Sequence, residues 1–237
     1  MSFKIVANWK MNFTLQQSTE YCKKLFNGVN DLSRLIIAVP SPYLAYLSNK
    51  FPKIQIAAQD ITDIDKDYGA YTGEVSAAML KSCAASYAIV GHSEKVKIYS
   101  ETTYMIRNKI KNCINHNIIP IICLGESQKI REKKNHLLYL EKLLYKLLPS
   151  GSNNIMLAYE PLWCIGRGVI PQESELQEVF GYINNCLSNI NAKLLYGGSV
   201  NEKNIADIKK IKGISGVLVG STSLDIESFT KLVNLNL

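Results

Sequence analysis

The 237-residue sequence has few features of a membrane, secreted or metal-bound protein. No apolar run approaches the about eighteen residues of a membrane-spanning helix. The first residues, Met1–Lys4, are too polar and too few for a signal peptide. Six cysteines are widely spaced and none forms a Cys-x-x-Cys pair, which argues against a disulfide framework and a zinc site. These absences predict a cytoplasmic protein with buried, reduced thiols and with no metal or other cofactor.

Acidic residues are fewer than basic ones, 20 against 27, which gives a net charge of +7. The basic residues cluster on stretches expected to be helical, with few aromatics beside them: Lys95–Lys97, Lys129–Lys134 and Lys209–Lys212. No pattern of a nucleic-acid-binding module accompanies them, so solvated helix faces are the preferred interpretation over a nucleic-acid partner. A positive field would still attract a small anion.

Apolar runs alternate with amphipathic stretches along the whole chain, as in an ordinary globular protein with 47% hydrophobic and 20% charged residues. Most runs are nearly continuous in apolar residues, which is typical of parallel strands covered on both faces. They lie at Lys4–Lys10, Arg34–Pro40, Ile54–Asp60, Tyr87–His92, Ile118–Gly125, Ile155–Glu160, Leu194–Gly197 and Val217–Gly220.

Helical periodicity is clearest at 136–148 and 174–190. Ser174 with Gln177 predicts a capping box, and Ser41-Pro42 predicts another helix start. Eight strand–helix units without a linker or a break in composition predict one domain, 1–237, folded as a closed (β/α)8 barrel, the TIM barrel. The alternative is an open, doubly wound sheet, but the Gly-x-Gly-x-x-Gly usual after its first strand is missing.

Polar residues end several of the predicted strands. Active sites of such barrels lie at the C-terminal ends of the strands, so these residues should meet at one mouth. Alternation places Asn8 and Lys10 on one face of the first strand. Later strands end at His92, at Glu160, and in the turns Gly197-Gly198-Ser199 and Gly220-Ser221.

This combination of residues indicates a chemistry. A partly desolvated carboxylate at Glu160 is a stronger base than one in water. Lys10 and His92 opposite it would stabilise an oxyanion. Glycine-rich turns expose N–H groups that suit a phosphate. We therefore expect proton abstraction beside the carbonyl of a small phosphorylated sugar, without a metal.

Each of these residues has a plainer interpretation when it is taken alone. A single histidine after an apolar run is more often structural, and His116 and His136 keep that interpretation. Glu94 is expected to hold a neighbouring cation, and Glu126 and Arg131 are expected to form a structural ion pair or to support a loop. The functional hypothesis depends on all the strand-end groups meeting on one rim.

Motifs along the chain resemble the triosephosphate isomerase family in their order and spacing, from about residue 4 to about residue 224. The resemblance implies interconversion of dihydroxyacetone phosphate and D-glyceraldehyde 3-phosphate, a step of glycolysis and gluconeogenesis. It is carried by Asn8-Trp9-Lys10-Met11-Asn12, Ala57-Ala58-Gln59-Asp60, Tyr71-Thr72-Gly73-Glu74, Val90-Gly91-His92-Ser93-Glu94, Cys123-Leu124-Gly125-Glu126, Ala158-Tyr159-Glu160-Pro161-Leu162-Trp163 and Tyr196-Gly197-Gly198-Ser199-Val200.

The resemblance also implies a role for each site residue. Glu160 matches the base that moves a proton between C1 and C2, and His92 matches the neutral electrophile. Lys10 matches the cation that faces the enediolate, with Asn8 and Glu94 as its neighbours. The backbone groups that hold the phosphate match Gly166, Ser199, Gly220 and Ser221.

Two loops of the family have counterparts here. Residues 162–169 match the lid that closes over the substrate. The long loop 60–75, with Tyr71-Thr72-Gly73, matches the loop that reaches into a second subunit, which implies a homodimer.

The sequence departs from the family at four positions. The lid tip has Arg167 where the family has threonine, and Val169 where it has lysine. Ser221 replaces the second glycine of the last turn, and Lys95 replaces an arginine. The lid changes put its closing energetics in doubt, and Lys95 loses a bidentate ion pair. A phosphate N–H remains at 221 if serine adopts the required backbone geometry.

Three other functions stay open at this point. Phosphate elimination from the same enediol would give methylglyoxal, although a complete lid at 161–169 argues against it. A phosphosugar-binding barrel without catalysis is disfavoured by the intact Lys10, His92 and Glu160. Nucleic-acid binding would exploit the positive charge and would depend strongly on salt.

Overall fold

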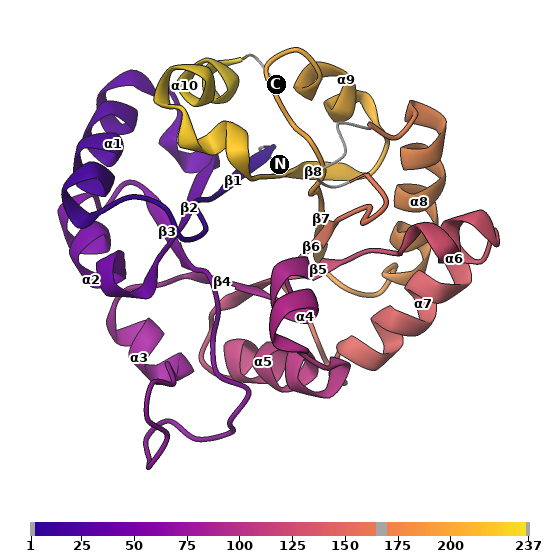
Figure 1. Ribbon diagram of the computed structural model, residues 1–237, viewed down its shortest axis with the longest axis horizontal. Coiled ribbons are helices and arrows are strands. Elements are labelled where there is room, and N and C mark those ends of the chain that lie inside the picture. Colours follow the sequence, from indigo (N-terminus) through magenta and orange to yellow (C-terminus); the bar gives the residue numbers. More distant parts are fainter. Residues whose placement is uncertain (1–2, 165–169, 236–237) are drawn as a thin grey trace.

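The computed structural model describes residues 3–164 and 170–235 and forms a closed barrel of eight parallel strands in the order β1 to β8. Pairing of β1 with β8, with Val6 opposite Leu218, closes the sheet. Figure 1 shows the helices as a ring around the strands. The predicted barrel is therefore confirmed.

Strands and helices alternate along the chain. The strands are β1 (Lys4–Asn8), β2 (Leu35–Val39), β3 (Gln55–Ala58), β4 (Tyr87–Val90), β5 (Ile119–Leu124), β6 (Ile155–Tyr159), β7 (Ala192–Tyr196) and β8 (Ile214–Val219). The helices are α1 (Leu15–Gly28), η1 (Leu32–Arg34), α2 (Ser41–Lys50), α3 (Ala77–Ser82), α4 (Ser93–Tyr99), α5 (Thr103–Asn115), α6 (Gln128–Glu132), α7 (His136–Leu147), α8 (Glu173–Cys186), α9 (Ile205–Lys210), η2 (Ser221–Leu224) and α10 (Ile226–Asn234).

Two hydrophobic clusters explain why the strands are apolar on both faces. Val6, Ile89 and Leu218 belong to a cluster that fills the barrel. Ile5, Leu157 and their alternating neighbours pack outward in a larger cluster that includes residues of the surrounding helices. Alternation along each strand therefore decides which side chain enters the barrel.

The predicted strand bounds are corrected by one to three residues in every strand; β3 and β4, for example, end at Ala58 and Val90, two residues before the predicted ends at Asp60 and His92. The first strand ends at Asn8, because Lys10 has a φ of 54°, in the left-handed region. β7 begins at Ala192 and β8 at Ile214, two and three residues before the predicted starts. Ala192 and Lys193 open β7, and Ser215 and Gly216 lie near the start of β8. These starts therefore lack the continuous apolar run on which the prediction was based.

Two predicted helix starts are also corrected. α8 has Gln172 at its N-cap, and the carboxylate of Glu175 accepts the Gln172 N–H at 2.8 Å, so the capping box lies two residues before Ser174. Ser41 is the first residue of α2 rather than its cap. Proline at the second position of α2 costs no hydrogen bond, because the first N–H groups of a helix have no partner within it.

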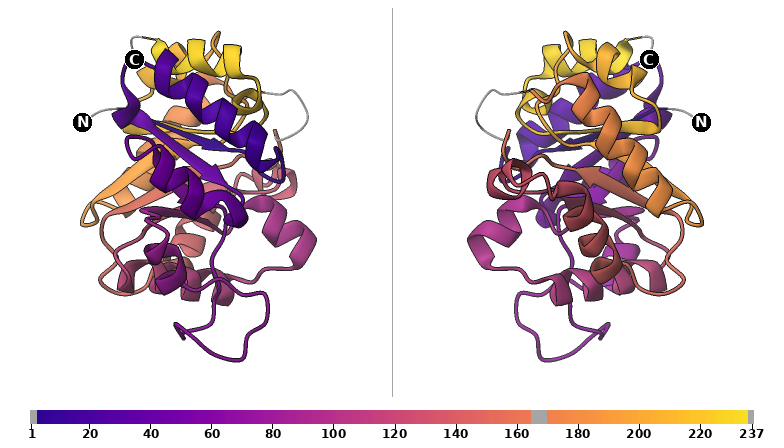
Figure 2. Two further views of the ribbon diagram at one scale, coloured as in Figure 1. Left: turned by 90° about the vertical axis from the view of Figure 1, so that its left-hand side faces the viewer. Right: turned by 90° about the vertical axis from the view of Figure 1, so that its right-hand side faces the viewer.

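No helix within the described residues is long and apolar enough to cross a membrane. The loop between β3 and α3 stands out from the barrel in both views of Figure 2. It carries Tyr68 and Tyr71, with 75% and 44% of their surface exposed.

Candidate active site

Alternation along the strands places the predicted site residues at the mouth of the barrel. Val6 faces the barrel interior, and Asn8, the last residue of β1, shares that face. Lys10 lies beyond the strand, and its left-handed backbone rather than strand alternation sets its direction. Met156 and Ala158 face inward on β6. Glu160, two residues after Ala158, lies on the same side. The side chains reach a cavity of about 470 Å³ whose lining includes Asn8, Lys10, His92, Glu94, Glu160, Ser199, Gly220 and Ser221.

Lys10 is held in a strained conformation by its neighbours. Its backbone is left-handed, which is unfavourable for a residue with a Cβ. Asn8 Oδ1 accepts the Lys10 N–H at 3.1 Å, and the Gln59 amide donates to the Lys10 carbonyl at 2.9 Å. The ammonium lies 2.6 Å from a carboxylate oxygen of Glu94, which agrees with the neighbour expected from the resemblance. Strain of this kind persists where the surroundings fix it, often at functional sites.

His92 occupies the N-cap of α4. Gly91 precedes it with a φ of 70°, which redirects the chain out of β4. The Nδ1 atom of His92 accepts the Glu94 N–H at 3.2 Å, and Nε2 lies 3.3 Å from Glu160 Oε1. If Nδ1 accepts, the ring proton belongs on Nε2, which then points at the Glu160 carboxylate.

Glu160 lies directly after β6 and is only 3% exposed. The Ser93 N–H donates to its Oε2 at 3.3 Å, so the first N–H of α4 compensates part of the cost of burying this carboxylate. Burial, together with the nearby Glu160, raises the pKa of the Cys123 thiol well above its usual value. Cys123 therefore stays a neutral neighbour of Glu160.

The turns after β7 and β8 form the other side of the cavity. The Thr222 hydroxyl donates to the Val200 carbonyl at 2.7 Å and ties the two turns together. Ser221 is the first residue of the 3-10 helix η2, a conformation that any residue adopts, so its N–H is available without glycine. Serine in place of glycine at position 221 is therefore compatible with a backbone N–H that binds phosphate there.

A buried carboxylate supports the segment that follows Glu160. Glu126 accepts the Tyr159 hydroxyl at 3.0 Å and the Trp163 indole N–H at 2.9 Å. The Arg131 guanidinium lies 3.6 Å from the same oxygen and stacks over the Trp163 ring. The expected structural role of Glu126 and Arg131 is confirmed.

Among the predicted site residues, only Gly166 falls outside the described part of the chain, together with the lid positions Arg167 and Val169. The prediction missed Ser93, Asn201 and Thr222, which also line the cavity. Ser93 contributes a backbone N–H, which no side-chain pattern reveals. Asn201 and Thr222 follow the predicted turns by one or two residues, so a longer window after each strand would have included them.

The other two histidines lie beside carboxylates outside this cavity. His116 lies 2.8 Å from Asp67, and His136 lies 3.2 Å from Glu178. No three His, Cys, Asp or Glu side chains gather at a possible metal site anywhere in residues 3–164 and 170–235.

Comparison with known proteins agrees with this geometry. The family model described as triosephosphate isomerase matches residues 3–236. Triosephosphate isomerases from Orientia tsutsugamushi (strain Ikeda) and Ehrlichia chaffeensis (strain Arkansas) are each 39% identical to this chain. The alignments cover 97% and 98% of this chain, respectively, and 96% of each relative.

A solved structure is similar over nearly its whole length. The crystal structure of triosephosphate isomerase from Bartonella henselae is 30% identical, with a TM-score of 0.86 and 98% of each chain covered. The chain therefore belongs to the triosephosphate isomerase family.

Proposed function

We propose that this enzyme interconverts dihydroxyacetone phosphate and D-glyceraldehyde 3-phosphate through an enediolate, with Glu160 as the base. The observation that carries the proposal is the meeting of Glu160, His92 and Lys10 around one cavity at the mouth of the barrel. Family membership supports the overall reaction. The roles of the individual residues are argued below from the contacts in the site.

Glu160 takes a proton from one substrate carbon and returns it to the neighbouring carbon. Its carboxylate has little contact with water, and the Ser93 N–H on Oε2 fixes its orientation. A base that is desolvated and already oriented loses little free energy to reorganisation when the proton moves.

His92 donates a hydrogen bond from Nε2 to the substrate carbonyl oxygen and shuttles a proton between O1 and O2. The Glu94 N–H occupies the Nδ1 lone pair, which supports a neutral ring with its proton on Nε2.

Lys10 faces the negative charge that develops on the enediolate. Glu94 holds the ammonium at the cavity wall, and the left-handed backbone of Lys10 directs the side chain there. Asn8 fixes that backbone and lines the same cavity. A fixed charge aimed at the developing oxyanion stabilises the transition state more than the ground state.

Backbone N–H groups of Ser199, Gly220 and Ser221 hold the phosphate dianion. The Thr222 bond between the two turns supports this, because it fixes the spacing of the donors before substrate arrives. Gly166 is proposed as a further donor from the segment outside the described residues.

Residues 162–169 act as the lid over the bound substrate. Support comes from the start of this segment, where Trp163 is held by Glu126 and Arg131. Pro161 stiffens the chain between the base and the lid. Exclusion of water protects an enediolate phosphate from losing its phosphate, which would give methylglyoxal.

Glu160→Gln tests the base. We expect turnover to fall by about 10²-fold to 10⁴-fold, because the amide cannot take a proton, while inorganic phosphate still binds. A coupled assay with dihydroxyacetone phosphate measures turnover, with methylglyoxal measured in parallel. Glu20→Gln, on α1, is the matched control and should behave as wild type. Near-normal turnover by Glu160→Gln would refute the assignment.

We also propose a homodimer through the loop 60–75. The two exposed tyrosines of this protruding loop, Tyr68 and Tyr71, favour a covered surface in the assembly. Light scattering should give twice the mass of the chain for wild type and a lower mass for Tyr71→Asp. Tyr145→Asp on α7, also at an exposed tyrosine, should leave the mass unchanged. A wild-type monomer at micromolar concentration would exclude the dimer.

A further inference from the structure

The short helix α4 supplies three contacts to the proposed active site. His92 is its N-cap, and the Ser93 N–H donates to Glu160 Oε2 at 3.3 Å. The Glu94 carboxylate lies 2.6 Å from the Lys10 ammonium. A shift of this helix would therefore displace the electrophile, the donor that orients the base, and the partner of the cation together.

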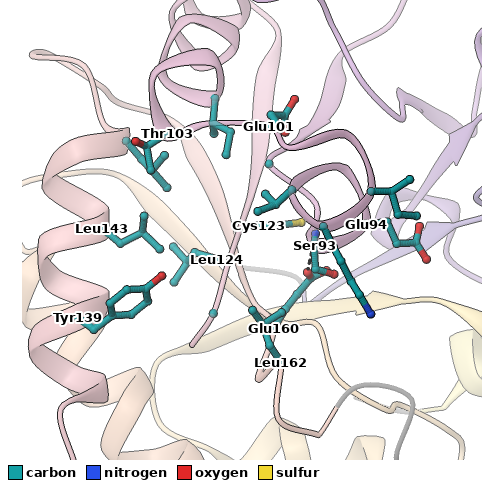
Figure 3. A pocket seen from close by; sticks show the side chains of 17 residues that line it. Ser93, Glu94, Glu101, Thr103, Cys123, Leu124, Tyr139, Leu143, Glu160 and Leu162 are labelled. Atoms are coloured by element: carbon teal, nitrogen blue, oxygen red, sulfur yellow. Dashed lines mark hydrogen bonds between the residues drawn. The ribbon is translucent and has the colours of Figure 1, made fainter. Parts of the chain in front are cut away.

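Packing of side chains does little to fix α4. None of its seven residues, all of them within the described part of the chain, is buried. Behind the helix lies a cavity of about 590 Å³, and Val96 and Ile98 of α4 form part of its lining. Figure 3 shows this cavity between α4, which carries Ser93, and α7, which carries Tyr139 and Leu143. A helix of a globular protein is usually held by an apolar face buried against the core, and α4 lacks such a face.

Charged side chains hold α4 at both ends instead. Lys95, in the first turn, places its ammonium 2.7 Å from Asp60 Oδ2. The Lys109 ammonium, on α5, lies 2.6 Å from the other oxygen of Asp60 and is also paired with Glu101, two residues after α4. We call these four residues the charge network. It connects the segment after β3 with both ends of α4 and with α5.

We propose that Asp60 is a positioning residue for turnover, which acts through Lys95 on the site groups that α4 carries. Asp60 follows β3 by two residues and is therefore attached to the barrel, whereas Lys95 belongs to the helix. Each oxygen of Asp60 already receives one ammonium, so lysine, which donates from a single point, is sufficient here and a bidentate guanidinium is not required. The inference rests on the proposed roles of His92 and Glu160.

The strength of this link comes from the network rather than from one ion pair. The side chains of Lys95 and Asp60 are 33% and 31% exposed, and an isolated pair with this exposure contributes little. Lys109 is only 5% exposed and orients the Asp60 carboxylate before Lys95 meets it. Without the link α4 can shift, and misplacement of catalytic groups by about 1 Å costs on the order of 10²-fold in rate. The phosphate turns follow β7 and β8, so KM should change less than kcat.

Lys95→Met removes the link to α4 and leaves both ion pairs of Lys109 in place. We expect kcat for glyceraldehyde 3-phosphate to fall at least about fivefold, with KM within about twofold of wild type. Lys95→Arg keeps the cation and should retain kcat within about twofold. Lys97→Met, at an exposed cation of the same helix, is the matched control and should behave as wild type. Wild-type kcat in Lys95→Met, or an equal loss in Lys95→Arg, would overturn the proposal.

Asp60→Asn tests the other partner of the same contact. It should lower kcat at least about fivefold in the wild-type background, but less than about twofold further in Lys95→Met, where the contact is already absent. Asp207→Asn, at the exposed ion pair with Lys210, is the matched control and should keep the wild-type kcat. Equal falls in the two backgrounds would show that Asp60 acts without Lys95 and would refute the positioning role.

Light scattering at the assay concentration shows whether a change of assembly causes the loss. Lys95→Met should have the same mass as wild type. A lower mass together with the lower kcat would assign the loss to assembly and would overturn the proposal.

Histidine NMR separates this proposal from the proposed function, because it needs no turnover. The chain has three histidines, and His92→Gln identifies the His92 signals in a ¹⁵N-histidine spectrum. Lys95→Met should shift the His92 ring signals and leave those of His136 unchanged. Unchanged His92 signals would refute positioning through α4. Shifted His92 signals, with a wild-type protein that lacks turnover, would preserve the positioning contact and refute the proposed function instead.

Discussion

Gly125→Ala should impair catalysis by displacing the backbone of Glu160. Gly125 follows β5, where the chain passes very close to the end of β6. A Cβ built on Gly125 would lie 1.7 Å from the Glu160 carbonyl oxygen and 2.7 Å from its carbonyl carbon. Both atoms belong to backbone, so no side-chain rotation relieves the collision. Glycine is required here by close approach.

The size of the effect follows from that distance. Real Cβ contacts are essentially never shorter than 3.0 Å, so the chain around Glu160 must move by more than 1 Å. The bond from the Glu160 N–H to the Leu124 carbonyl, now 2.8 Å, lies beside the collision and would be strained. Misplacement of a catalytic group by about 1 Å costs on the order of 10²-fold in rate. Overpacking should also lower the free energy of unfolding by about 1–3 kcal/mol.

The coupled assay with dihydroxyacetone phosphate and a urea unfolding curve measure both effects. KM should change little, because the phosphate turns follow β7 and β8. Gly181→Ala is the control, since a Cβ at this half-buried position of α8 meets nothing within 4 Å. It should keep wild-type kcat and raise the free energy of unfolding by about 0.5–1 kcal/mol. A folded Gly125→Ala protein with kcat within threefold of wild type would refute the reasoning.

Two further predictions concern stability. Burial opposes the charge of Lys109, but Asp60 and Glu101 outweigh it and raise the pKa of its ammonium. Lys109→Met leaves these carboxylates without that cation, and urea titration should show a loss of about 3–5 kcal/mol; Lys210→Met, at an exposed ion pair, should unfold like wild type.

Burial raises the pKa of Cys22 and Cys113 to about 12. Above about pH 9 the native state keeps these thiol protons while the unfolded chain loses them. The contribution of each thiol to the free energy of unfolding is therefore fully present below about pH 9 and falls above it. The fall is at most about 1.4 kcal/mol per pH unit for each thiol. Urea midpoints measured at increasing pH should show this fall, and Cys113→Ala should make it shallower; a midpoint independent of alkaline pH would contradict it.

The fold could be predicted because its signal is repeated along the chain. Eight apolar runs with helical stretches between them leave few architectures, and alternation within each strand fixes the inward face. Asn8 ends β1 on the inward face and Glu160 follows β6 directly, so their meeting could be predicted from the sequence, whereas Lys10 reaches the site through a left-handed backbone that alternation does not predict. His92 was harder, because the positive φ of Gly91 changes the direction of the chain just before it.

Contacts between distant segments could not be predicted in the same way. The cap of α8 depends on Gln172 and Glu175, neither of which follows the preferred N-cap pattern as well as Ser174 does. The need for glycine at 125 comes from the backbone of Glu160, a residue 35 positions away in the sequence. The local structural preferences of residues carry no information about contacts between segments this far apart in the sequence.

Buried carboxylates show the same limit. The side chain of Glu101 is 2% exposed and is paired with the ammonium of Lys109, yet in the sequence it looks like an ordinary acid before a helix. Glu160 lies at the edge of an apolar region, where the substrate cavity and the Ser93 N–H receive its charge. Which partner compensates each buried charge is decided by segments that are distant in the sequence, so the sequence alone could not predict it.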